Sequence, residues 1–358
     1  MIPRKWTPGQ AYHHTYDTAI DAAAPHQVVA APPLRWQTEL QQALRDPEEL
    51  WRILQLPPQH LAAARLAAQR FPLRVPRAYV TQMRVGDMDD PLLRQVLPLD
   101  AELAPTLGFV SDPVGDQHAL VGPGLLHKYQ ARALVIVTGA CAIHCRYCFR
   151  REFPYAEHSG AVGAAWPATL ANIAQLPDIH EVILSGGDPC VVSDERLASV
   201  VRDLACLPQL STVRVHTRLP VVLPNRVTEG LLAALTATRL TPVLVIHCNH
   251  PQELSAEVAQ ALDQLRRAGV RLFNQAVLLR GVNDDLATLI QLCKRVFDLG
   301  VTPYYLHLLD RVAGAAHFEV EEAAAVALHA QLEASLPGYL VPRLVREIPG
   351  APAKTRVR

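Results

Sequence analysis

The sequence predicts an α/β fold in which a partial (β/α)6 barrel follows an N-terminal helical region. Six short β-branched or apolar runs begin at about residue 134, and a helical stretch follows each of the first five. Residues before about 125 lack this alternation. Six units suit an open or partial barrel better than a closed eightfold one. We therefore expect a parallel sheet covered by helices, with ligand-binding groups at the carboxyl ends of the strands.

The N-terminal region, residues 1–125, is predicted to be helical with proline breaks. Its helical patterns, the last of them charged, cover residues 36–54, 59–69 and 88–96. Pro72 and Pro76 mark interruptions. The Gly-, Pro- and Asp-rich stretch 106–124 is expected to be the loop that leads into the barrel.

The barrel core is expected over residues 126–310, followed by a C-terminal segment, 311–358. The predicted strands are 134–138, 181–185, 212–217, 242–247, 272–278 and 302–308. The predicted helices are 167–175, 193–206, 228–237, 253–268 and 285–299. In the fourth helix Val258, Leu262 and Leu265 keep an apolar face at helical spacing, and Gly269 follows as a stop.

The composition excludes several classes of protein. Half of the 358 residues are hydrophobic, and 34 basic residues balance 34 acidic ones. A zero net charge gives no field that attracts nucleic acid or anionic lipid. The first ten residues lack a signal peptide's apolar core, and no apolar run has the length of a membrane helix. We expect a cytoplasmic protein with reduced cysteines, which contacts neither nucleic acid nor membrane and whose oligomeric state stays open.

Three of the seven cysteines, Cys141, Cys145 and Cys148, lie within eight residues directly after the first predicted strand. Three thiolates on one loop suit three irons of a cubane cluster and leave the fourth iron open. A structural zinc site needs four ligands, and His144, between two cysteines, is poorly placed to complete one. The other cysteines, Cys190, Cys206, Cys248 and Cys293, lack ligand spacing and are expected to be small buried apolar residues.

The spacing C-x3-C-x2-C after the first strand resembles the signature of the radical S-adenosylmethionine (SAM) enzymes, whose barrel is a partial TIM-like one. Longer strings resemble the lysine 2,3-aminomutases: CRYCFRR (145–151), LSGGD (184–188), TRLPVVLP (217–224), HP (250–251), NQ (274–275), LRGVND (279–284) and PYY (303–305). DPLLRQVLP (90–98) and SDPVG (111–115) also match. The continuation FRREFPY (149–155) and the end of the chain soon after Lys354 resemble the bacterial branch that serves elongation factor P.

The resemblance implies three cofactors: a [4Fe-4S] cluster, SAM and pyridoxal 5'-phosphate (PLP). It assigns the cluster to Cys141, Cys145 and Cys148, and it assigns SAM to Ser185, Gly186, Gly187, Asp188, His247 and Gln275. The glycines alone are equally typical of a turn between strand and helix. Lys354 matches the lysine that forms a Schiff base with PLP and is the implied catalytic residue. It is one of four lysines beside 30 arginines, although the glycine-rich run usual around this lysine is reduced to one glycine.

The remaining implied contacts bind phosphate and substrate. Lys128 and Arg132 match the pair that binds the PLP phosphate, and Arg150 matches the arginine that binds the substrate carboxylate. Asp310 and Glu347 match two acids that hold the distal ammonium of lysine. The second acid is Asp in the longer catabolic enzymes, so Glu347 departs from them. The C-terminal segment 311–358 is thus expected to close the active site as a PLP-binding tail.

The implied activity is an isomerase that moves the α-amino group of L-lysine to the β-carbon. The product β-lysine would then serve modification of elongation factor P through a lysine ligase, and an electron donor of the flavodoxin or ferredoxin type would reduce the cluster. Two alternatives stay open. A glutamate 2,3-aminomutase would carry neutral or basic groups at Asp310 and Glu347, and a non-catalytic iron-sulfur or zinc protein would leave Arg150 and Lys354 unexplained.

Overall fold

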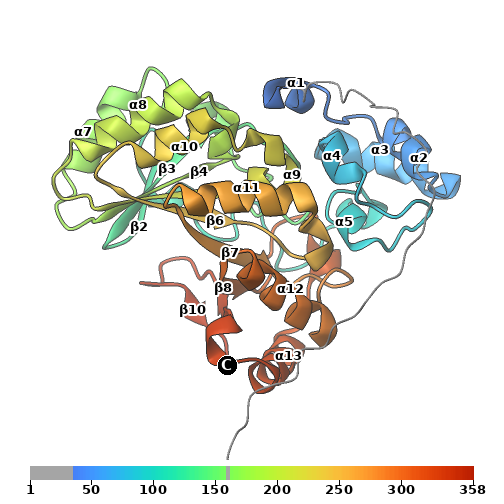
Figure 1. The fold of residues 1–358 in the computed structure, drawn as a ribbon. Helices are drawn as coiled ribbons and strands as arrows, with labels where there is room; N and C mark the ends of the chain where they lie inside the picture. The colour runs from blue at the N-terminus through green and yellow to red at the C-terminus, as the bar shows by residue number, and fades with distance from the viewer. Residues whose placement is uncertain (1–34, 159–161) are drawn as a thin grey trace, which may run out of the picture. The chain divides into compact units, whose positions relative to one another are not determined.

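A ten-stranded sheet organises the fold, and its strands lie side by side in chain order (Figure 1). The computed structural model describes residues 35–158 and 162–358, so part of the predicted N-terminal helical region, residues 1–34, lies outside the described residues. The strands are β1 Leu120–Gly122, β2 Leu125–Tyr129, β3 Arg132–Thr138, β4 Glu181–Gly186, β5 Thr212–Thr217, β6 Thr241–Ile246, β7 Arg271–Val277, β8 Thr302–His307, β9 Arg343–Arg346 and β10 Thr355–Arg356.

Strands β3 to β9 are parallel, whereas β1 and β2 at one end and β10 at the other pair antiparallel. β4 is buried along nearly its whole length, as expected of a parallel strand covered on both faces. The parallel register aligns the carboxyl ends of these strands along one edge. β1 and β10 end the sheet order without pairing to each other, so the predicted partial barrel is confirmed.

All six predicted strands are confirmed, with ends that differ by at most two residues. Four strands were missed: β1, β2, β9 and β10. β1 has three residues, β9 four and β10 two, which is too short for a periodic pattern to be recognised. Their consequence is large, because β9 and β10 place the C-terminal segment within the sheet rather than beside it.

Helices cover the outer face of the sheet between successive strands (Figure 1). They are α7 Trp166–Ala174, α8 Asp194–Ala205, α10 Glu229–Thr236, α11 Ala256–Arg267, α12 Leu286–Asp298 and α13 Glu322–Ser335, while the four-residue helices α6 Tyr155–His158 and α9 Leu219–Val222 belong to the segments that follow β3 and β5. The five predicted helices are therefore confirmed. The side chains of Ser193, Thr228, Ser255 and Asp285 accept hydrogen bonds from backbone N–H groups in the first turns of α8, α10, α11 and α12.

The described part of the N-terminal region contains five short helices. They are α1 Trp36–Gln41, α2 Pro47–Leu54, α3 Leu61–Arg70, α4 Arg77–Val80 and α5 Pro91–Arg94. The predicted helix over 36–54 is interrupted, because Pro47 begins a new helix that the Asp46 carboxylate caps. The pattern over 88–96 gives only α5, which also starts at a proline after a capping aspartate, Asp90.

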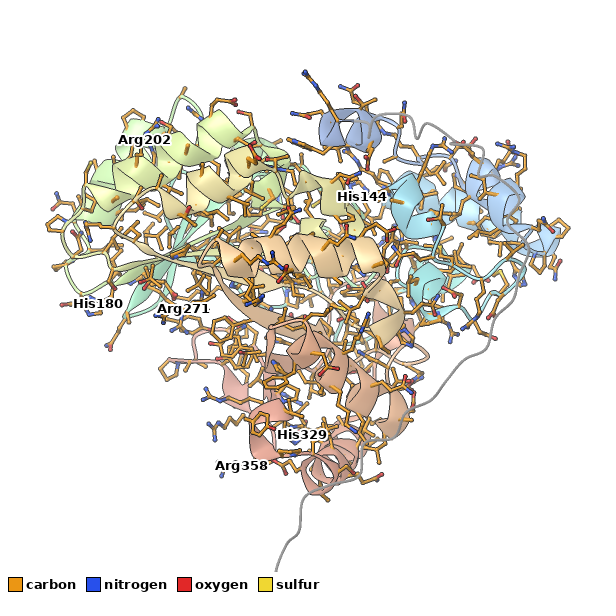
Figure 2. All side chains as sticks on the ribbon, in the orientation of Figure 1. His144, His180, Arg202, Arg271, His329 and Arg358 are labelled. Carbon is orange, nitrogen blue, oxygen red and sulfur yellow. The ribbon has the colours of Figure 1, made fainter. Side chains whose placement is uncertain are left out.

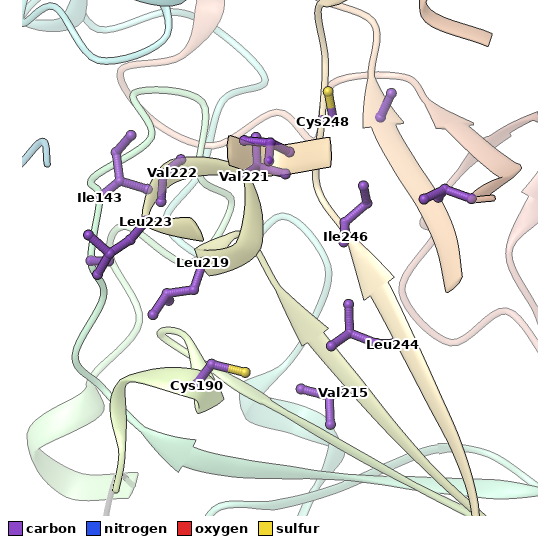
Figure 3. Close-up of a cluster of buried hydrophobic side chains, with 14 of the residues drawn as sticks. Ile143, Cys190, Val215, Leu219, Val221, Val222, Leu223, Leu244, Ile246 and Cys248 are labelled. Atoms are coloured by element: carbon purple, nitrogen blue, oxygen red, sulfur yellow. The ribbon is translucent and has the colours of Figure 1, made fainter. Parts of the chain in front are cut away.

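Apolar side chains fill the space between sheet and helices, and Figure 3 shows part of this core. Cys190 and Cys248 are buried there as expected, and Cys293 is buried elsewhere in the same core. The expectation of burial was wrong for Cys206, which is exposed because it caps the end of α8. In the part of the chain that the structure describes, no helix is long and apolar enough to cross a membrane.

Candidate functional site

A cavity of about 320 Å³ opens at the carboxyl edge of the parallel strands. Every predicted site residue lines it: Cys141, Cys145, Cys148, Ser185, Gly186, Gly187, Asp188, His247, Gln275, Lys128, Arg132, Arg150, Asp310, Glu347 and Lys354. These residues come from positions up to 226 apart in the chain, between Lys128 and Lys354. Most of them lie at or just after the carboxyl ends of strands that end at the same edge, whereas Lys128 lies within β2 and Arg132 begins β3, so the cavity extends from this edge into the barrel.

The three cysteines lie on the loop after β3. Burial, with added electrostatic repulsion between their thiolate forms, raises the pKa of Cys141 well above its usual value and that of Cys148 to about 11. In residues 35–158 and 162–358 no three His, Cys, Asp or Glu side chains already stand at metal-binding spacing. A cubane cluster binds each thiol sulfur to a different iron, so the three sulfurs need not converge on one point, and its positive irons would favour the deprotonated thiols.

His144 borders the cavity, but its imidazole is engaged by the N-terminal region. Its Nδ1 lies 2.8 Å from the Pro72 carbonyl oxygen, and its ring stacks on Phe71 at 5.1 Å. Figure 2 shows His144 on the side of the molecule where α4 lies. The structure therefore gives His144 a packing role and leaves the three cysteines as the ligands that the loop offers.

Gly186 and Gly187 bring the end of β4 against the start of the cysteine loop. A Cβ atom at Gly187 would lie 2.3 Å from the Ala140 carbonyl oxygen, and Gly186 has a φ of +122°. The Gly187 N–H donates to the Thr138 carbonyl oxygen at 2.7 Å, and the Asp188 N–H donates to that of Ala140 at 2.8 Å. Close backbone approach thus explains both glycines, and it also shapes the cavity floor beside the cysteines.

The Asp188 carboxylate is turned into the protein rather than offered to a ligand. It accepts from the Thr217 hydroxyl at 2.7 Å, the Arg218 N–H at 2.8 Å and the Cys190 N–H at 2.9 Å. Burial raises the pKa of Asp188 to about 6, although these hydrogen bonds oppose the rise. The structure thus assigns Asp188 to joining the ends of β4 and β5.

Arg150 and Lys128 share one carboxylate, Asp116. The Arg150 Nε donates to Asp116 Oδ2 at 2.6 Å, and the Lys128 Nζ lies 2.6 Å from Oδ1. The Arg150 Nη1 also donates to the Ser185 hydroxyl at 3.1 Å. Burial alone would raise the pKa of Asp116, but the two cations outweigh it and hold this pKa below its usual value. Asp116 therefore fixes the guanidinium and the ammonium relative to each other.

Lys354 and Glu347 face each other across the antiparallel pair of β9 and β10. Thr355, which follows Lys354, pairs with Arg346, which precedes Glu347. This register places Lys354 opposite Glu347, and the Lys354 Nζ lies 2.7 Å from Glu347 Oε2. The Tyr129 hydroxyl donates to Glu347 Oε1 at 2.5 Å. Burial would raise the pKa of Glu347, but Lys354 outweighs it and lowers this pKa. The hairpin thus preorganises the lysine and its acid.

Asp310 lies on the wall between this cavity and a second, more polar one of about 250 Å³. Burial raises the pKa of Asp310 to about 7, Lys354 partly opposes the rise, and Glu347 adds to it. Glu347 also lines both cavities, so the two carboxylates belong to the wall that separates them. A cation bound here would lower the pKa of Asp310 again.

The cavity suits anionic and polar ligands. Seven cationic side chains line it against four anionic ones. The Nε2 atoms of His216 and His307 are buried in its wall without a hydrogen-bond partner in the described structure. Burial lowers the pKa of His247 to about 4, so this ring, 6.1 Å from that of His216, is neutral. Arg132 lies over the Tyr129 ring, 4.3 Å from its centroid.

The fit to the three implied cofactors rests on these features. The orphaned imidazole nitrogens and the cationic side chains of the wall, most of which already have a carboxylate partner, would pair with the phosphate and carboxylate groups that PLP and SAM carry. The three thiols suit a four-iron cluster in which one iron lacks a cysteine ligand. Two lysines line the cavity, Lys128 and Lys354, and Lys354 pairs with Glu347 on the carboxylate wall.

Three further residues at this site were missed from the sequence: Asp116, Tyr129 and Arg218. Asp116 follows the SDPVG string, and Arg218 belongs to the TRLP string, so both lay within or next to matched segments. Asp116 and its partner Arg150 are 34 residues apart in the chain, and Arg218 and its partner Cys145 are 73 apart. No local sequence pattern encodes such pairs. Tyr129 had no signal of its own.

Comparison with known proteins gives consistent matches. Residues 121–210 match the family described as a 4Fe-4S single cluster domain. The chain is 47% identical over 321 residues to the L-lysine 2,3-aminomutase of Escherichia coli strain K12, covering 89% of this chain and 93% of that one. It is 43% identical to that of Haemophilus influenzae, covering 92% and 98%. Identity to the enzyme of the same name from Clostridium subterminale is 32%, covering 90% and 77%.

Proposed function

The chain belongs to the L-lysine 2,3-aminomutase family, and from this membership we propose that it moves the α-amino group of L-lysine to the β-carbon to give β-lysine. The observation that carries the proposal is the composition of one cavity. It holds a thiol triplet, an anchored arginine, a lysine at the end of a hairpin and two carboxylates. When bound, the cluster with SAM supplies radical chemistry and PLP supplies an electron-accepting ring, which an amino migration between adjacent carbons needs.

Arg150 would bind the substrate carboxylate. Asp116 already holds its Nε, and Ser185 already holds Nη1, so the guanidinium has few orientations left. A fixed guanidinium loses little conformational entropy when a carboxylate binds, and such charge-assisted contacts position the substrate without distorting it.

Asp310 and Glu347 would bind the distal ammonium of lysine. In the structure the Lys354 ammonium already pairs with Glu347. If Lys354 is engaged by PLP, Glu347 and the neighbouring Asp310 are left without this cation, and a partly buried carboxylate pair favours a replacement. The same wall disfavours the second carboxylate of glutamate, so lysine is the better substrate.

The finer assignments are also proposals. Lys354 would be the PLP lysine, Lys128 and Arg132 would bind its phosphate, and His247, Gln275 and residues 185–188 would border SAM. The product would serve modification of elongation factor P, as the resemblance of the FRREFPY string to the bacterial branch implies. A flavodoxin- or ferredoxin-type donor, a cytoplasmic location and a division into 1–125, 126–310 and 311–358 complete the proposal.

Anaerobic incubation of L-lysine with the reduced, cluster-loaded protein, SAM and PLP tests the activity. Mass spectrometry after chiral derivatisation should detect β-lysine, and the Cys145→Ala variant should give none. Unchanged lysine from wild-type protein with full iron, sulfide and PLP content would contradict the proposal. Glutamate offered in place of lysine distinguishes the alternative aminomutase.

A further inference from the structure

A buried hydrogen-bond network lies directly behind the cysteine loop. Its centre is Arg218, which follows β5 and has 5% of its surface exposed. The Arg218 Nη1 donates to Cys145 Sγ at 2.7 Å. Its Nη2 donates to Glu253 Oε2 at 2.8 Å, Gln95 Oε1 at 2.6 Å and the Tyr79 hydroxyl at 3.1 Å. One guanidinium therefore joins a cysteine of the proposed cluster site to a buried carboxylate.

Glu253 is itself held rigidly. It is fully buried, and its Oε1 accepts from the Asn249 and His250 N–H groups at 2.9 and 3.0 Å and from Gln95 Nε2 at 3.2 Å. The carboxylate thus has partners on both oxygens. Because neither member of the Arg218–Glu253 pair can rotate freely, the guanidinium keeps a fixed direction toward Cys145.

We propose that Arg218 is a positioning residue that sets the reduction potential of the cluster through its hydrogen bond to Cys145, with Glu253 as its buried counterion. This inference rests on the proposed function, because it needs Cys145 as a cluster ligand. Hydrogen bonds to ligand sulfurs and net nearby charge are established determinants of the potential of iron-sulfur clusters. Both act here through one side chain.

The direction of the effect follows from the geometry. The guanidinium contacts the sulfur directly, while the Glu253 carboxylate lies on the opposite side of the guanidinium. A donor and positive charge next to the sulfur stabilise the more negative, reduced cluster. Removing them should lower the potential, whereas neutralising Glu253 should leave the positive charge uncompensated and raise it.

Arg226 provides a matched control. It is fully buried, it pairs with Asp194 at 2.7 Å, and it donates to the Cys190 carbonyl oxygen at 2.5 Å. It also lies over the Trp36 ring and does not line the cavity. Replacing Arg226 removes a buried arginine of similar structural weight without touching a cysteine of the loop.

The experiment is an anaerobic redox titration of the reconstituted cluster, followed by electron paramagnetic resonance, in wild type, Arg218→Gln, Glu253→Gln and Arg226→Gln. Arg218→Gln should lower the reduced-to-oxidised ratio at a fixed potential at least about tenfold, which is about 59 mV for one electron. Glu253→Gln should shift the potential in the opposite direction. Arg226→Gln should match wild type, although all three variants are less stable to heat.

Arg218→Lys covers the case in which Arg218→Gln loads no cluster. The lysine ammonium keeps the positive charge but cannot contact Cys145 and Glu253 through two separate nitrogens. The cluster potential of Arg218→Lys should therefore fall between that of wild type and that of a variant lacking the donor. Equal potentials in wild type and Arg218→Lys, or in wild type and a loaded Arg218→Gln, would overturn the inference. A wild-type protein that binds no iron or sulfide would instead refute the proposed function.

Discussion

Replacing Asp310 with asparagine probes the proposed binding site for the distal ammonium of lysine. The substitution keeps the size of the side chain and removes its charge. Charge-assisted hydrogen bonds contribute roughly 1.5 to 3 kcal/mol each. We therefore expect Asp310→Asn to lower kcat/KM for lysine at least about tenfold, or about 1.4 kcal/mol. Cluster content and PLP loading should persist, since Asp310 contacts neither the cysteine loop nor Lys354 by a hydrogen bond in the described structure.

The same substitution should stabilise the cofactor-free protein. The pKa of Asp310 rises from 3.8 to about 7 on folding, mainly through burial. Between these values the folded protein holds a proton that the unfolded chain has released, so wild-type stability falls as the pH rises through this window. At 1.36 kcal/mol per pKa unit the full cost above pH 7 is at most about 4 kcal/mol, and solvent in the cavity reduces it. The variant lacks this pH-dependent loss.

Two measurements check the reasoning together. Norleucine, which lacks the distal ammonium, should be a poor substrate of the wild type and should lose little further in Asp310→Asn. Thermal denaturation between pH 4 and 8 should show the variant gaining on wild type as the pH rises. If lysine and norleucine suffer equally, Asp310 acts on something common to both substrates, and if the stability difference is independent of pH, its carboxyl does not titrate as the structure indicates.

Two further predictions concern the proposed PLP lysine and a buried ion-pair cluster. Lys354→Ala should abolish the Schiff-base absorbance of bound PLP and the borohydride-trapped adduct, and a peptide map that finds the label on Lys128 or Lys294 would contradict the assignment. Glu102→Ala should destabilise the fold by about 3 to 5 kcal/mol, because it leaves the buried Arg146 and Arg151, at 2.5 and 2.8 Å from this carboxylate, without their anion. Chemical denaturation measures this loss. Arg84→Ala, which breaks an exposed pair with Asp87 and a 3.7 Å contact with buried Asp90, should cost less than about 1 kcal/mol, because Asp90 keeps its hydrogen bonds from the Leu92 and Leu93 N–H groups.

The central sheet could be predicted because its strands are apolar runs of six or seven residues between well-capped helices. Such periodicity is local, and the sequence states it directly. The order of parallel strands then implies that groups following different strands meet at one edge. This reasoning predicts that Ser185, His247, Gln275 and the three cysteines lie close together, and all six line one cavity.

The partners of these groups could not be predicted in the same way. The Lys354–Glu347 contact depends on the register of a two-residue strand, β10, with β9. The sharing of Asp116 by Lys128 and Arg150 depends on how the loop before β1 folds back over the cavity. In both cases the decisive geometry is tertiary, so residue types and spacing carry no trace of it.

The chain order of the strands bears on how the site forms. Each hydrogen-bonded strand pair joins consecutive strands, so each pairing closes only the crossover between two neighbouring strands, and the entropic cost of closure rises slowly with its length. The contacts that Arg218 makes with Gln95 and Tyr79 instead span 123 and 139 residues. These long-range contacts require both the N-terminal helices and a largely assembled sheet. We therefore expect the sheet to form before the surroundings of the cysteine loop, which acquires its contacts with Arg218 and the N-terminal helices late in folding.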